Sequence, residues 1–128
     1  QVGDWFEERV FAPLRAANDP RPALEAMARE VAAYFTSRER ICLFAAMAMA
    51  EERETFAAAI RTYFADWVDA LAGALRTGGL TDRAATDLAL DAVAAMQGGL
   101  ILARAYDDDE TFLGIVDRTR ARLADAVA

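Results

Sequence analysis

The stretch LALDAVAAMQGGLILA, residues 88–103, decides the fold because it forms a helix with almost no polar side. At about 100° per residue, bulky and small side chains separate onto two faces. The bulky face holds Leu90, Val93, Met96, Leu100 and Ile101, and the small face holds Ala92, Ala95, Gly99 and Ala103. A helix that is apolar nearly all round must be covered on both sides. We expect the bulky face to pack inside its own subunit and the small face to meet a second copy of the chain.

The composition of the whole chain favours helices. At 128 residues it is long enough for one domain. Alanine dominates a hydrophobic fraction of 55%, while only 7 glycines and 3 prolines supply turn material. Alanine is the best helix former and is depleted in strands. No segment shows a period of two, so we predict an all-α fold.

Apolar spacing divides the chain into six expected helices. Asp19 and Pro20 have the residue types of an N-cap and a first helical position, and Gly78-Gly79 has those of a helix end. Thr81 or Asp82 caps the fifth helix, and the charged patch 51–54 marks a bend or loop. The expected helices cover residues 3–17, 20–36, 36–50, 56–75, 82–106 and 111–127.

The chemical inventory excludes most enzyme classes. There are no histidines, so the commonest general base and metal ligand are missing, and Cys42 has no histidine to activate it. A net charge of −7 disfavours direct contact with nucleic acid. Asp87, Asp91 and Arg104 interrupt the apolar run, which argues against a membrane span. We therefore expect a cytoplasmic protein with no catalytic residues, metal or cofactor.

What remains is an aromatic and methionine-rich apolar surface spread over several helices. Such residues pack in cores, but they also line cavities that bind small apolar ligands. Gln97 and Arg104 project onto the apolar face of the fifth helix, where a polar group needs a partner. The candidate ligand-binding residues are Trp5, Met27, Phe35, Phe44, Met47, Tyr63, Phe64, Trp67, Met96 and Gln97.

The chain resembles the C-terminal regulatory domain of TetR-family transcriptional regulators. The order of helices carries the resemblance, together with a set of short motifs. These are Asp19-Pro20, Arg40-Ile-Cys42-Leu43, Ala50-Glu51-Glu52, the 56–75 helix, Gly78-Gly79, the segment MQGGLILAR at 96–104, and a final helix.

This resemblance implies a homodimer in which the last two helices of each copy form a four-helix bundle. It also implies a pocket for a small hydrophobic effector that controls binding to operator DNA, as in a repressor. Residues 1–17 would form a connector helix, 19–77 the pocket helices and 81–127 the dimerisation helices. The helix-turn-helix of the family has no counterpart here, so DNA contact would belong to an N-terminal domain ahead of Gln1.

The narrow stripe of the last helix extends the expected dimer interface. With the small face of the fifth helix, it comprises Ala92, Ala95, Gly99, Ala103, Phe112, Val116, Thr119 and Leu123. Two alternatives stay open. The chain could be a helical interaction or structural dimerisation module with a filled core and no ligand, or an enzyme acting on a hydrophobic substrate.

Overall fold

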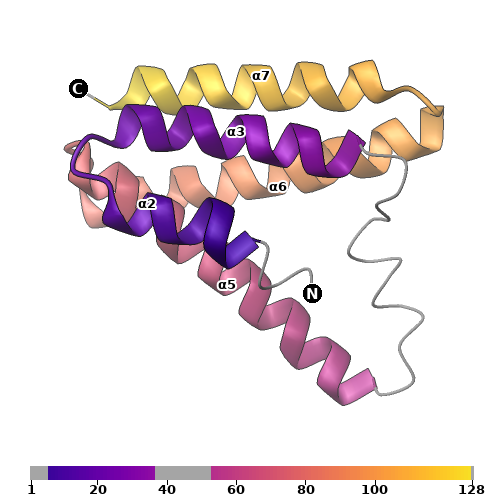
Figure 1. The fold of residues 1–128 in the computed structure, drawn as a ribbon, viewed down its shortest axis with the longest axis horizontal. Coiled ribbons are helices and arrows are strands. Elements are labelled where there is room, and N and C mark those ends of the chain that lie inside the picture. The colour runs from indigo at the N-terminus through magenta and orange to yellow at the C-terminus, as the bar shows by residue number, and fades with distance from the viewer. Residues whose placement is uncertain (1–5, 37–52, 128) are drawn as a thin grey trace.

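The computed structural model describes residues 6–36 and 53–127, with the side chains of 53–57 excepted, and the regular elements of this part are all helices, joined by short turns (Figure 1). The elements are η1 (Glu7–Phe11), α2 (Ala12–Ala16), α3 (Pro20–Thr36), α5 (Arg53–Thr77), α6 (Asp82–Tyr106) and α7 (Asp109–Ala126). The predicted all-α class is confirmed for this part of the chain. The predicted helix 36–50, with Cys42, Phe44 and Met47, lies outside the described residues, as does Trp5.

Helices α3, α6 and α7 lie roughly parallel to one another, while α5 crosses them obliquely (Figure 1). α6 contacts α5 on one side and α7 on another, and α7 also contacts α3. The short N-terminal elements η1 and α2 pack against α3 and α5. α6 is therefore covered from two directions within one chain.

Local side-chain caps set the helix starts. The Asp19 carboxylate accepts a hydrogen bond from the backbone N–H of Arg21 at 3.2 Å, and α3 begins at Pro20, as predicted. Thr81, rather than Asp82, caps α6 by accepting from the N–H of Ala84 at 3.2 Å. α5 begins at Arg53, so the predicted loop over 51–54 is wrong for Arg53 and Glu54. Arginine and glutamate are good helix formers, so a charged run does not by itself end a helix.

The N-terminal segment departs from the expected regular helix. Residues Glu7–Phe11 form a π-helix, in which the N–H of Ala12 donates to the carbonyl of Glu7, and an α-helical turn follows. Pro13 lies at this junction and has no N–H to donate. Where the hydrogen-bond spacing changes from five residues in the π-helix to four in the α-helix, one backbone carbonyl receives no N–H from the helix. A proline at that point therefore costs no hydrogen bond.

Two helix ends use the same backbone motif with different residues. After α5, the N–H of Leu80 donates to the carbonyl of Leu75 at 3.1 Å, and Gly79 adopts a positive φ of 107°. After α6, the N–H of Asp108 donates to the carbonyl of Ala103 at 2.9 Å, and Asp107 adopts a φ of 52°. Gly78 is required for a different reason, since a Cβ there would lie 2.5 Å from a methyl carbon of Val127.

The core is an aromatic cluster centred on Phe6, which is fully buried. Its ring lies 5.1 Å from those of Tyr34 and Tyr63 and 6.0 Å from that of Trp67, measured between centroids. The indole N–H of Trp67 points to the sulfur of Met27 at 3.4 Å, so the buried polar group of Trp67 has a partner. The cluster joins η1, α3 and α5 into one unit.

The orientation of α6 differs from the expected one. Val93, Met96 and Leu100 are buried, as expected, but Leu90 and Ile101 are 50% and 57% exposed. Gly99, one of the four small residues, faces α7 of the same chain, where a Cβ on it would lie 3.1–3.2 Å from three atoms of Ile115. This glycine thus lets two helices of one subunit approach closely.

The two left-handed helix ends predict opposite effects of substitution. Gly79→Ala should lower the free energy of unfolding by about 1 kcal/mol. The added Cβ would contact no other atom, so the whole effect comes from the positive φ, which strains the backbone of an alanine. Asp107→Gly should raise it by about 0.5 kcal/mol, since glycine removes that strain but makes the unfolded chain more flexible. Urea unfolding followed by circular dichroism measures both, with Asp107→Asn as the control for lost charge. Shifts in the same direction would contradict this account.

The contact between α6 and α7 predicts that Gly99→Ala destabilises the fold by about 1–3 kcal/mol, although alanine is the better helix former. The new methyl group would press on Ile115, which is branched close to its own backbone. The cost should disappear in an Ile115→Ala background, as measured by a double-mutant cycle. An equal cost in both backgrounds would show that the glycine acts through something other than this contact.

Candidate functional site

The predicted ligand-binding residues that the structure describes fall into two groups, and the other three, Trp5, Phe44 and Met47, lie outside the described residues. Five of them are buried core residues, whose side chains pack in or beside the aromatic cluster: Met27, Phe35, Tyr63, Trp67 and Met96. Phe64 and Gln97 instead line a groove at the surface. Arg104 is exposed, so its predicted place on the buried apolar face is wrong. The reason is again the rotation of α6 about its axis.

The groove that contains Phe64 and Gln97 lies between α5 and α6 and has a volume of about 330 Å³. α5 contributes Phe64 and Val68, which lie one turn apart. α6 contributes Leu90, Val93, Ala94 and Gln97, which recur at helical spacing on one side. Five of these six side chains are hydrocarbon, and Gln97 is the exception.

Gln97 is 9% exposed, and its side-chain amide makes no hydrogen bond to any residue that the structure describes. Glutamine is rarely buried without a partner, because the amide loses hydration. Sequence reasoning identified Gln97 from its position on the helix, but it did not include Val68, Leu90, Val93 or Ala94 among the ligand-binding residues. Their role depends on how α5 crosses α6, which no local pattern reports.

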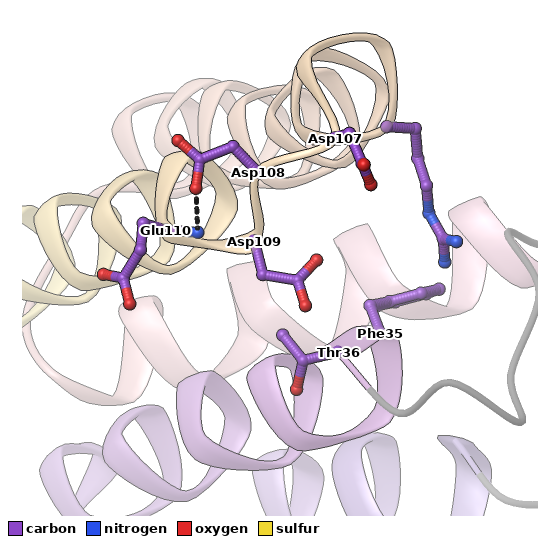
Figure 2. A pocket seen from close by; sticks show the side chains of 7 residues that line it. Phe35, Thr36, Asp107, Asp108, Asp109 and Glu110 are labelled. Atoms are coloured by element: carbon purple, nitrogen blue, oxygen red, sulfur yellow. Dashed lines mark hydrogen bonds between the residues drawn. The ribbon is translucent and has the colours of Figure 1, made fainter.

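A second cavity, of about 570 Å³, is strongly acidic. It lies where α3 ends, beside the turn between α6 and α7 (Figure 2). Phe35 and Thr36 form one wall, and Arg104 and the run Asp107–Glu110 contribute charged groups. The Asp108 carboxylate accepts a hydrogen bond from the N–H of Glu110 at 3.1 Å, as the dashed line in Figure 2 marks. The acidic run thus caps α7, as a helix N-terminus favours.

Two arginines, Arg120 and Arg15, form ion pairs at the surface. The guanidinium of Arg120 lies 3.0 Å from Asp117 and 3.2 Å from Glu25, which links α7 to α3. The hydrogen bond to Asp117 is the main cause of a raised pKa for Arg120. The hydrogen bond to Glu7 likewise raises the pKa of Arg15. Both arginines are charged at any physiological pH, so neither shift creates a titrating site.

The α6–α7 hairpin has an outer face that the rest of the described chain leaves open. On α6 this face carries Ala95, Gly98 and the 43% exposed Leu102, at helical spacing. On α7 it carries Gly114 and Arg118. A Cβ on Gly98 would meet no atom within 4 Å, and one on Gly114 would meet only the mobile end of Arg118. We call these five residues the hairpin outer face.

The predicted dimer residues occupy a different position from this face. Ala95 lies on it, half-buried, whereas the other seven predicted residues are buried inside the subunit between α6, α7 and their neighbours. They are Ala92, Gly99, Ala103, Phe112, Val116, Thr119 and Leu123. Residues already covered within one chain offer little surface to a second copy. The two glycines in mid-helix, Gly98 and Gly114, were the signal that sequence reasoning left unused.

The described residues hold no group of three or more acidic, cysteine or histidine side chains placed to bind a metal ion. Among them, α6 is the one helix long and apolar enough to cross a membrane. Core helices pass the same test, and α5 and α7 pack on α6. We therefore interpret α6 as a core helix.

Comparison with known proteins identifies the family. Residues 20–118, from the start of α3 to the middle of α7, match the family described as the C-terminal domain of LmrA/YxaF-like transcriptional regulators. No curated protein matches the chain. The matched region is well over half of the chain and includes the helices that form the groove, the acidic cavity and the hairpin. The chain belongs to this family of TetR-type regulator C-terminal domains.

Proposed function

We propose that this domain joins two copies of a transcriptional regulator and senses a small apolar effector. Family membership supports a regulatory role. The observation that carries dimerisation is the pair of open glycines on the hairpin outer face. A glycine in mid-helix costs about 1 kcal/mol relative to alanine, and the described chain supplies no contact that requires Gly98 or Gly114.

Close approach of a second pair of helices accounts for both glycines. A two-fold axis would place the hairpin outer face of one copy on the same face of the other, forming a four-helix bundle. The small side chains let the backbones approach, and Leu102 supplies apolar area. Arg118 and Asp91, beside this face, form no ion pair with the described residues, so each is available to pair across the interface.

The sensing role rests on the groove between α5 and α6. Small-molecule sites are concave and mostly apolar, with few polar groups, and this groove has those properties. We propose a binding and not a catalytic role in the cytoplasm, with operator DNA bound by an N-terminal domain. The packed rings around Phe6 favour the second candidate, a structural dimerisation module with a filled core.

Dimerisation predicts that Gly98→Leu yields a monomer while the subunit stays folded. The new side chain enters open space in one subunit but blocks the approach of a second hairpin. Light scattering coupled to gel filtration measures the mass, and circular dichroism checks the fold. Ala33→Leu, at an exposed alanine of α3, is the matched control and should remain dimeric. A Gly98→Leu dimer as tight as the unaltered one would place the interface elsewhere.

Sensing predicts that some neutral apolar compound raises the melting temperature of this domain by mass action. The same compound should change the affinity of the complete regulator for its operator, because the effector binds two conformations unequally. A thermal-shift screen followed by fluorescence anisotropy on operator DNA measures both. Compounds that stabilise the domain without any effect on DNA binding would favour the structural module.

A further inference from the structure

Gln97 is a polar residue that the packing of the described chain does not explain. Its side chain is nine-tenths buried, and its amide finds no hydrogen-bond partner among the described residues. The residues that share the groove with it offer only hydrocarbon surface. The amide atoms keep a slight contact with solvent. A largely buried amide that makes no hydrogen bond within the protein has still lost part of its hydration, and an apolar side chain of the same size would avoid that cost.

We propose that the groove between α5 and α6 binds a neutral, flat and mostly hydrocarbon molecule that carries an amide-like group. In this arrangement the Gln97 amide is the hydrogen-bonding partner of the ligand. The inference rests on the proposed sensing function and names the site and the chemical class of its effector.

The neutrality of the ligand follows from the lining. None of the six residues that form the groove is charged. A charged ligand would lose hydration on entering and would find no opposite charge in return. The charged residues of the acidic cavity are not among those that line the groove.

The amide-like group follows from the chemistry of glutamine. A primary amide has both donor N–H groups and an acceptor oxygen, so it is best matched by a group that has one of each side by side. A lactam meets this requirement with two reciprocal hydrogen bonds. Phe64, whose ring also packs edge-on against Tyr63 with the centroids 4.9 Å apart, gives the lining of the groove an aromatic side chain, and flat molecules pack well beside aromatic side chains. The volume of about 330 Å³ lies at the small end of the range for small-molecule sites.

The position of Gln97 connects the ligand to the rest of the hairpin. Gln97, Gly98 and Gly99 are consecutive residues of α6 that face the groove, open space and Ile115, respectively. A ligand that binds Gln97 contacts the same helical turn that packs closely against Ile115 through Gly99. A shift of this turn on ligand binding would therefore also move Gly98 and the hairpin outer face.

The test uses three probes of similar shape on this chain. They are 2-quinolinone, which has a lactam, naphthalene, which has no hydrogen-bonding group, and 2-naphthoate, which is charged. We expect 2-quinolinone to bind most tightly, naphthalene more weakly and 2-naphthoate not at all. Isothermal titration calorimetry measures affinity, and the side-chain amide signals of Gln97 in a ¹⁵N NMR spectrum should shift with 2-quinolinone.

Gln97→Leu separates a ligand-binding role from a structural one. We expect it to raise the melting temperature of the free chain, because it removes a buried amide without a partner. It should also weaken 2-quinolinone binding by roughly tenfold, since two neutral hydrogen bonds are lost, and leave naphthalene binding unchanged. A lower melting temperature for Gln97→Leu would show that the amide stabilises the fold, and it would overturn the proposal.

Ala94→Trp tests the location of the site. Ala94 is exposed at the edge of the groove, so a tryptophan there can fill the groove without entering the core. All binding of 2-quinolinone should be lost, while Ala33→Trp on α3 should leave it unchanged. Binding that survives Ala94→Trp, or no binding of 2-quinolinone to the unaltered chain, would overturn the proposal. The proposed function is judged separately, by the mass of Gly98→Leu and by the wider compound screen.

Discussion

The close contact between Gly99 of α6 and Ile115 of α7 is the constraint on which the rest of this domain depends. At Gly99, α6 has no side chain, so α7 of the same subunit can pack closely against its backbone. Because that side of α6 is occupied, the remaining sides of the helix take the other roles. One borders α5 and forms the apolar groove, and one stays open on the hairpin outer face. The rotation of a single helix about its axis therefore sets the position of both candidate sites.

The two surfaces to which we assign a proposed function are places where the sequence departs from local stability. Gln97 is a largely buried amide in hydrocarbon surroundings, and Gly98 and Gly114 stand inside helices at positions where alanine would be more stable. Such departures are expected at functional sites, because elsewhere local preference and tertiary packing agree. In the rest of the α6–α7 hairpin, local preference and tertiary packing agree: Thr81 caps α6, and the apolar Val116 and Leu123 are buried.

The aromatic cluster around Phe6 is packed in the core of the described chain. Residue types that line ligand cavities are the same ones that fill cores, so a list of aromatic and methionine residues does not distinguish the two. In this domain, the indole N–H of Trp67 donates to the sulfur of Met27, and the ring of Phe6 contacts the rings of Tyr34 and Tyr63. The cluster ties η1 to α3 and α5, which makes it the structural link between the N-terminal segment and the groove helices.

The sequence by itself determined the all-helical class of the described residues and several of their helix ends, because caps and turns are local. Asp19-Pro20, Thr81 and Gly78-Gly79 act on residues within one turn, and each was predictable. Only the tertiary structure decided which side of α6 faces which neighbour. A helix that is apolar nearly all round has no polar stripe to define its outer side, so periodicity leaves its rotation open. The crossing of α5 and the approach of α7 supply that information, and they are contacts between segments distant in the chain.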